Sequence, residues 1–325
     1  MNTIRRTVVL ALAALALLPR IGRGQRALRR IAWFGVGLPE TVLPYLGALQ
    51  AGLRDSGWEE GRNLTIDRYS STRAPEDFER IVREIVDAKP EVVVTQEFAT
   101  LAMLRFAASV PVVFGFSGDP VEAKLVKSLA RPGTNFTGIS YLASELVGKR
   151  IEFLKEALPG IRRIGILARP QHPGEHGERT ASEDAARKLG LAVAYFPIRD
   201  PAEIDQAFVA MRDAKCDALV VFPDFTMFTN RERLARLAAA ARLPAVSGWS
   251  SFADSGLLFN YGPNLRDIYR SLAPFVDRIL RGAKPEELPV ELPRSIELVV
   301  NLRTARDLGI KVPQSILVRA DRVIE

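Results

Sequence analysis

Apolar segments of strand length alternate with amphipathic segments in two successive runs, and this alternation constrains the fold more than any other feature. The first run places strands at 31–36, 64–69, 92–95 and 110–116 and helices at 41–56, 75–88, 99–108 and 119–129. After a helix at 144–158, the second run places strands at 163–168, 191–196, 218–222 and 244–247 and helices at 178–189, 202–214 and 231–241. The pattern predicts an α/β protein with two doubly wound lobes, each built on a parallel sheet covered on both faces.

The C-terminal part is less regular than the two runs. It predicts a strand at 257–261, a helix at 265–281, a Pro- and Glu-rich linker at 283–294, a strand at 296–301 and a short helix at 303–308. This tail is too small for a third domain, so we expect it to cross back and complete both lobes. The predicted division is 25–142 plus 262–291 for lobe 1 and 143–261 plus 292–325 for lobe 2. Several crossings make a hinge, and a hinge between two lobes makes a cleft.

The first 24 residues have the order of a secretory signal peptide. Arg5 and Arg6 precede the uncharged apolar stretch Thr7–Pro19, which is short for a bilayer span, and small residues follow at Gly22 and Gly24. We therefore expect export to the periplasm. An uncleaved anchor and a twin-arginine route remain as alternatives.

Charge and cysteine content exclude several kinds of partner. Removing the four arginines of the signal segment lowers the formal net charge from +7 to +3, and the remaining basic residues are scattered among acids, so we expect no nucleic acid. Cys216 is the only cysteine, so no intrachain disulfide forms, and its position before an apolar strand favours a buried or half-buried thiol. We expect a monomer without a cofactor.

The motifs that suggest catalysis are incomplete. Gly35-Val36-Gly37 begins a dinucleotide-binding fingerprint, but Glu40 stands at its third glycine position and would repel a pyrophosphate. His172, Glu175 and His176 have the spacing of a zinc-binding helix, yet the intervening Pro173 and Gly174 predict a loop, and we expect no metal there. The chain shows no nucleophile elbow or phosphate-binding loop, so we predict no enzyme.

Polar and aromatic residues gather where the predicted strands end. In doubly wound folds ligands bind beyond these carboxyl ends, and a mixture of hydroxyl, amide, charged and aromatic groups suits a small organic ligand. The predicted ligand-binding residues are Gly37, Leu38, Gln96, Glu97, Phe98, Phe116, Ser117, Gly118, Asp119, Arg169, His172, Asp224, Phe225, Trp249 and Tyr261.

Structural roles compete at several of these positions. Asp119 stands before Pro120, a typical start for a helix, so capping is the stronger interpretation there. Asp224 equally suits a cap or a turn, and Phe98 and Trp249 equally suit a hydrophobic core.

The sequence resembles the substrate-binding proteins of bacterial ABC transporters, in the family whose better-known members bind tryptophan or tyrosine. The resemblance covers nearly the whole chain and is most specific at 52–70, 110–140 and 296–325, including Arg131-Pro132-Gly133-Thr134-Asn135. It implies a type I periplasmic-binding-protein fold with three crossovers. It further implies capture of a small molecule between the lobes and delivery to a membrane permease powered by an ATPase.

Two turns depart from the family pattern. Gln96-Glu97-Phe98 stands where a Thr-Gly-Gly-like turn is usual, and Arg169-Pro170-Gln171-His172 where an Asn-Pro-Asn-like turn is usual. Glu97 and Phe98 change charge and volume in the cleft, which argues against carrying aromatic amino acids over as ligands. Arg169 could receive a carboxylate, so anionic or zwitterionic molecules fit. The alternatives are a sensory module for a membrane receptor and an enzyme on the same scaffold.

Overall fold

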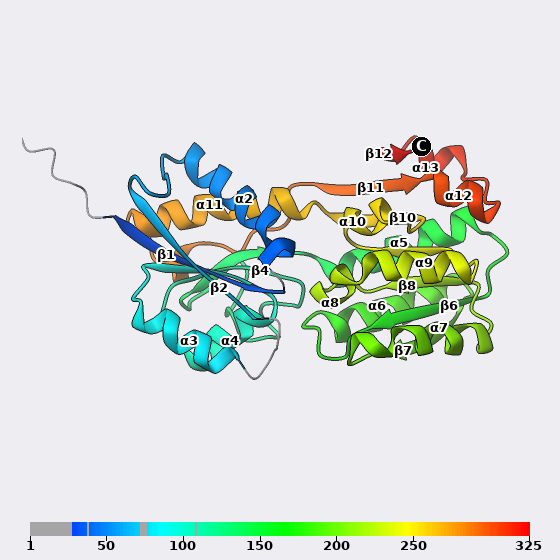
Figure 1. Cartoon of the computed structure of the whole chain (residues 1–325), viewed down its shortest axis with the longest axis horizontal. Coiled ribbons are helices and arrows are strands. Elements are labelled where there is room, and N and C mark those ends of the chain that lie inside the picture. The colour runs from blue at the N-terminus through cyan, green and yellow to red at the C-terminus, as the bar shows by residue number, and fades with distance from the viewer. Residues whose placement is uncertain (1–27, 38, 72–76, 108) are drawn as a thin grey trace, which may run out of the picture.

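The computed structural model describes residues 28–37, 39–71, 77–107 and 109–325, and it shows two lobes side by side (Figure 1). The predicted signal segment and Leu38 lie outside the described residues. None of the helices in this part of the chain has the length and apolarity needed to cross a bilayer.

The first lobe is built on a five-stranded parallel sheet with the order β2-β1-β3-β4-β5. Its strands are β1 (Arg29–Val36), β2 (Leu64–Ser71), β3 (Val92–Gln96), β4 (Val112–Phe116) and β5 (Phe136–Ser140). Alternate residues of β1 face opposite cores: Ile31 and Trp33 pack with α2 (Pro39–Asp55) and α11 (Leu265–Leu280), whereas Ala32 and Phe34 pack with α3 (Phe78–Asp87) and α4 (Phe98–Phe106).

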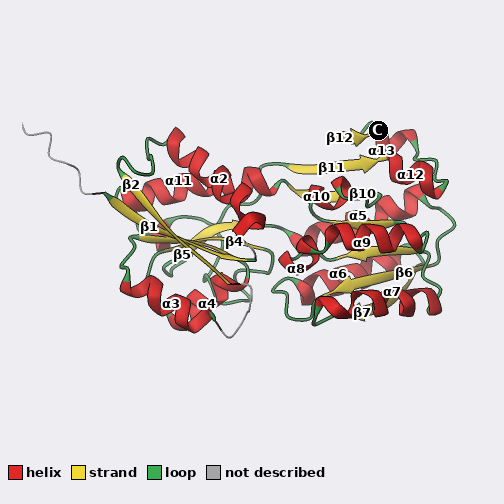
Figure 2. Cartoon of the chain, viewed as in Figure 1, coloured by secondary structure: helices red, strands yellow, loops and turns green. Residues whose placement is uncertain are grey.

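The second lobe is built on a seven-stranded sheet with the order β12-β11-β10-β9-β8-β6-β7. Its strands are β6 (Arg163–Ala168), β7 (Ala192–Pro197), β8 (Ala218–Val221), β9 (Ala245–Ser247), β10 (Phe259–Pro263), β11 (Ile296–Asn301) and β12 (Arg322–Ile324). One face packs on α5 (Ala143–Ala157) and α6 (Glu175–Lys188), and the other on α7 (Ile204–Asp213) and α9 (Arg231–Ala240). Shorter helices complete the lobe: η2 (Pro201–Glu203), α8 (Phe225–Thr229), α10 (Ser250–Asp254), α12 (Leu302–Leu308) and α13 (Gln314–Leu317). Figure 2 shows helices on both sides of each sheet.

The chain crosses between the lobes three times, which confirms the predicted two-lobe α/β fold. The crossovers run from β5 to α5, from β10 to α11, and from η3 (Pro285–Glu287) to β11. The helix α11 therefore packs on α2 in the first lobe, although it follows β10 of the second. One pairing is not parallel: β11 returns antiparallel to β10, because it enters the sheet from the other lobe.

Two local predictions need correction. Residues 119–129 form turns and no helix; Lys124 has a positive φ of 59°, and the adjacent Leu125 and Val126 both enter the core. The segment around His176, predicted as a loop, belongs to α6, which begins at Glu175. Gly177 serves packing there, because a Cβ atom on it would lie 2.3 Å from the Ser144 hydroxyl of α5.

Other segments differ from the sequence-based expectation. The strand β5 and the five-residue helices α8 and α10 were not predicted. The segment predicted as a linker at 283–294 contains η3 and joins the edge of the first sheet through an isolated bridge between Ile139 and Glu291.

Candidate functional site

The carboxyl ends of the parallel strands meet at the interface between the lobes, and the polar residues that follow them come together there. Glu97 follows β3 and Ser117 follows β4 in the first lobe, while His172 follows β6 in the second. The Ser117 hydroxyl donates to Oε2 of Glu97 at 2.7 Å and lies 3.2 Å from Nε2 of His172. One serine thus connects residues of both lobes.

Two further buried charges extend this group into the second lobe. Glu178 of α6 lies with its Oε2 3.8 Å from His172 Nε2, and its Oε1 accepts from Nη1 of Arg150 in α5 at 2.8 Å. Arg150 and Glu178 side chains are 1% and 0% exposed, so the ion pair is entirely inside the protein. We call Glu97, Ser117, His172, Glu178 and Arg150 the interlobe polar cluster.

Burial sets the protonation of this cluster. It raises the pKa of Glu97 to about 8, and it raises the pKa of Glu178 to about 7 against the lowering effect of Arg150. Burial, helped by the nearby Arg169, lowers the pKa of His172 to about 3. At neutral pH His172 is therefore neutral, and Glu97 holds a proton unless a positive charge approaches it.

The backbone at Glu97 is held in a conformation that L-residues rarely adopt. Its φ of 48° and ψ of −120° lie in the region that glycine favours, as in the first central position of a type II′ turn. Such conformations cost roughly 1–3 kcal/mol and cluster at functional sites. The carboxylate is 2% exposed, and its Oε1 atom has no hydrogen-bond partner within the described chain.

A second polar contact lies beside the cluster. Nη1 of Arg169 is 3.4 Å from Oδ2 of Asp224 and donates to the Thr226 hydroxyl at 2.6 Å, while its Nε is buried without a partner among the described residues. The guanidinium also lies 5.8 Å from the ring centroid of Phe98 in the other lobe. Asp224 caps α8 by accepting from the Met227 amide, so the capping interpretation of Asp224 is confirmed.

Aromatic residues from both lobes pack together next to these polar groups. Tyr45 of α2 lies 6.2 Å from Phe225 and 6.1 Å from Phe228, measured between ring centroids. Trp249, at the end of β9, is 5.6 Å from Phe225 and only 3% exposed. Trp249 is thus a core residue as well as a residue of the interface.

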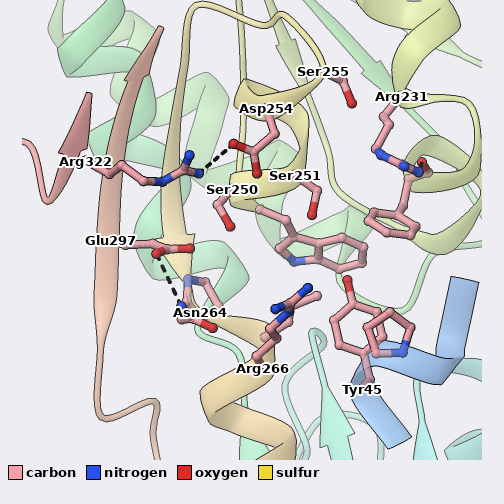
Figure 3. A pocket seen from close by; sticks show the side chains of 15 residues that line it. Tyr45, Arg231, Ser250, Ser251, Asp254, Ser255, Asn264, Arg266, Glu297 and Arg322 are labelled. Carbon is pink, nitrogen blue, oxygen red and sulfur yellow. Dashed lines mark hydrogen bonds and ion pairs between the residues drawn. The ribbon is translucent and has the colours of Figure 1, made fainter. Parts of the chain in front are cut away.

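A cavity of about 510 Å³ is lined by Tyr45, Phe228 and Trp249 of this aromatic group and by residues at two of the crossovers (Figure 3). Its walls include Tyr45, Arg231, Ser250, Ser251, Asn264 and Arg266. Figure 3 shows Asp254 paired with Arg322, and Glu297 with Asn264, at one wall, and Tyr45 across from them. Of the predicted site residues that the structure describes, Trp249 is the one that lines this cavity.

Other predicted residues have clear structural surroundings. The Gln96 side chain accepts a hydrogen bond from the Tyr269 hydroxyl at 2.6 Å and donates one to the Val36 carbonyl. Gly37 directly follows Val36 at the end of β1 and has a φ of 121°. The ring of Tyr261 packs on Phe153 at 5.3 Å in the core of the second lobe. The assignment of these residues to ligand binding stays a prediction.

The remaining predicted residues, Phe116, Gly118 and Asp119, lie at or after the end of β4. Gly118 abuts the other lobe: a Cβ atom on it would lie 2.8 Å from the Pro173 carbonyl oxygen. Asp119 caps the following turn by accepting from the amides of Val121 and Glu122, so it caps no helix. Phe116 is fully buried and packs on Phe114.

Sequence reasoning missed the partners supplied by helices. Arg150, Glu178, Tyr45 and Tyr269 lie within helices, away from the strand ends that guided the prediction. Ser250 and Ser251, which line the cavity, directly follow Trp249, so a search of the residues after each strand could have found them. His176 is exposed while His172 is buried, and no group of three metal-ligating side chains occurs within the described residues.

Two sheet-based lobes joined by three crossovers, with polar and aromatic residues meeting between them, define the two-lobe class of periplasmic binding proteins. A conserved domain protein from Vibrio cholerae O1 biovar El Tor has this fold, with a TM-score of 0.85 and 28% identity over 91% of this chain and 99% of that one. An ABC domain from Streptococcus pneumonia, solved in complex with L-Trp, matches with a TM-score of 0.83 and 25% identity over 92% of this chain and 100% of its own.

The chain belongs to the ABC transporter substrate binding protein family, whose model matches residues 41–324. A curated relative, the tyrosine-binding protein of Clostridioides difficile (strain R20291), is 24% identical over 260 residues, which cover 80% of this chain and 74% of the relative. The homologues are substrate-binding proteins and not enzymes, which confirms the expectation that this chain is no enzyme.

Proposed function

We propose that this protein is the exported solute-binding component of an ABC importer and that it captures a small organic molecule between its lobes by hinge closure. The observation that carries the proposal is the contact of strand-end residues from both lobes, above all Ser117 with Glu97 and His172. A ligand that touches both lobes favours the closed arrangement over the open one. The relatives that bind tyrosine and L-Trp support an amino acid or another small carboxylate as the ligand.

Arg169 and Asp224, with the aromatic rings of Phe98, Phe225 and Trp249, are the residues we assign to ligand contact. The unpartnered Nε of Arg169 is a donor that a ligand carboxylate can use, and the rings supply apolar surface. A substrate binding protein from Clostridium difficile, solved in a ligand-free, open form, has the same fold with a TM-score of 0.69 and 22% identity. Because the chain belongs to the ABC transporter substrate binding protein family, we assign to it delivery of the ligand to a membrane permease driven by an ATPase, on the outer side of the membrane.

The test is a thermal-shift screen of the protein against amino acids, aromatic acids and other small carboxylates, followed by small-angle scattering with each compound that binds. A ligand at a hundredfold excess over its dissociation constant adds about 2.7 kcal/mol to the unfolding free energy. Scattering is expected to show a more compact particle on binding. A shape that no binding compound alters would refute hinge closure.

Glycine variants at the interface sharpen this test. Gly118→Ala places a Cβ atom 2.8 Å from the Pro173 carbonyl oxygen of the other lobe, so it opposes closure; it also meets Cε1 of Phe116, so its melting temperature is measured as well. Gly174→Ala approaches the Ser117 carbonyl oxygen at 3.1 Å from the opposite side. The matched control is Gly160→Ala, whose Cβ meets nothing within 4 Å. Both interface variants should bind more weakly than the control.

A further inference from the structure

We propose that Glu97 recognises a positively charged nitrogen of the ligand through its unpartnered Oε1 atom. The inference rests on the proposed solute-binding function and adds the chemistry of the ligand. It defines the ligand as a small molecule with a protonated amine or a related cationic group.

The first argument is the charge inventory of the interface. Each of the other two buried carboxylates there has its own cation: Glu178 pairs with Arg150 at 2.8 Å, and Asp224 with Arg169 at 3.4 Å. Among the described residues Glu97 receives only neutral donors, the Ser117 hydroxyl on Oε2 and the Ser117 backbone, and its Oε1 has no hydrogen-bond partner. A buried carboxylate without a cation is costly, and a ligand cation removes that cost.

The second argument is the backbone of the turn. Glutamate stands at a φ of 48° and a ψ of −120°, where glycine is free of strain. Packing gives no reason for a long acidic side chain at this position, because it brings a buried charge in addition to the strained backbone. Recognition of a cation gives such a reason, since the same strand end faces the other lobe across Ser117 and His172.

The third argument is the charge of the groups around Glu97: those nearest to it are neutral or acidic, so none of them repels a cation that replaces its proton. From the first lobe Ser117 and the hydroxyls of Tyr141 and Tyr269 lie near it, both tyrosines being neutral because burial raises their pKa values well above 10.0. The groups that face it from the second lobe are His172, Glu178 and Asp224, with Arg169 and Arg150 behind the two acids.

Binding is therefore linked to a proton. The pKa of Glu97 is about 8 in this structure, so the carboxyl is protonated at neutral pH, and an incoming cation releases close to one proton. The proton leaves to the solvent as the carboxylate forms and pairs with the ligand nitrogen. Below pH 8 the affinity should therefore fall about tenfold for each unit by which the pH is lowered, and it should level off above pH 8.

The experiment uses sets of three compounds built on one carbon skeleton: an amine, the corresponding amino acid and the deaminated carboxylate. Indole, phenol and isobutyl skeletons give tryptamine, tyramine and 3-methylbutylamine with their partners. Titration calorimetry at pH 7 in phosphate and in Tris measures affinity and the number of protons released. The variants are Glu97→Gln, Glu97→Gly, which suits the turn backbone, and the control Glu183→Gln, whose side chain is exposed on α6.

Compounds with a protonated nitrogen should bind the wild type and the control with release of close to one proton. Both Glu97 variants should lose about tenfold to a hundredfold in affinity for these compounds and release no proton. If deaminated compounds bind as well as their amino partners, or if Glu97→Gln leaves the affinity unchanged, the inference is wrong while solute binding stands. If no compound of any charge class binds, solute binding itself is contradicted and the inference falls with it.

Discussion

The Arg150–Glu178 ion pair offers a sharp test of how the second lobe is held together beneath the interface. Nη1 of Arg150 donates to Glu178 at 2.8 Å and Nε donates to the Tyr261 carbonyl at 2.8 Å. The turn at Gly248 closes over the guanidinium so tightly that a Cβ atom there would lie 2.5 Å from Nη2. The guanidinium is therefore enclosed by protein on this side.

We expect Arg150→Met to lower the free energy of unfolding by about 3–5 kcal/mol at pH 8, because it leaves the Glu178 carboxylate buried without its cation. The loss should be smaller at pH 5. Burial raises the pKa of Glu178 to about 7 in the wild type, and removing Arg150 raises it further, so at pH 5 the side chain is neutral in the folded variant.

Urea unfolding at both pH values measures the effect, and a double-mutant cycle with Glu178→Leu separates the pair from its surroundings. The double variant Arg150→Met with Glu178→Leu should recover most of the loss, because two apolar side chains replace two buried charges. A loss below about 1 kcal/mol for Arg150→Met at pH 8, or a double variant as unstable as the single one, would refute the reasoning.

Substitutions at three further positions have defined outcomes. Gly52→Ala should cost about 1–3 kcal/mol in urea unfolding, because its Cβ would lie 2.4 Å from the Arg270 carbonyl oxygen where α2 crosses α11; an unchanged midpoint contradicts this packing. Asp224→Ala should cost about 1–2 kcal/mol through loss of the cap to Met227, and Asp224→Asn, which keeps an acceptor, should cost less. Glu97 has a folded pKa near 8 against an ordinary 4.5, so the wild type should lose stability as pH rises through that window. Glu97→Gln should unfold with a flatter pH dependence, and an equally steep one would count against a buried carboxyl.

The sequence predicts the elements whose signal is local and repeated. The apolar strands β1, β3, β4, β6 and β8 stand within a few residues of their predicted bounds, because each is buried on both faces. The half-buried Cys216 also agrees with its prediction. The strand-end rule, applied to the predicted doubly wound fold, also selected Glu97, Ser117 and His172, which the structure brings into contact.

Features that depend on tertiary contact escaped prediction. The strand β5 contains Gly138, whose φ of 152° allows its backbone to approach Phe114, and it lacks the apolar run of its neighbours. The helices α8 and α10 have five residues each, too short for a helical period to show. The pairing of Arg150 with Glu178 joins residues 28 apart in two helices, and no local pattern encodes it.

The interleaved path of the chain has a consequence for how the protein is made. The helix α11 completes the packing of α2 only after nearly all of the second sheet has been synthesised, and that sheet in turn waits for β11 and β12 near the end of the chain. Neither half can mature as an independent unit on the ribosome. The newly made polypeptide therefore stays accessible to chaperones and to any translocation machinery until its last residues emerge. Removing about the last thirty residues would delete β11 and β12 from the edge of the second sheet, and we expect the whole second lobe to lose its cooperative unfolding.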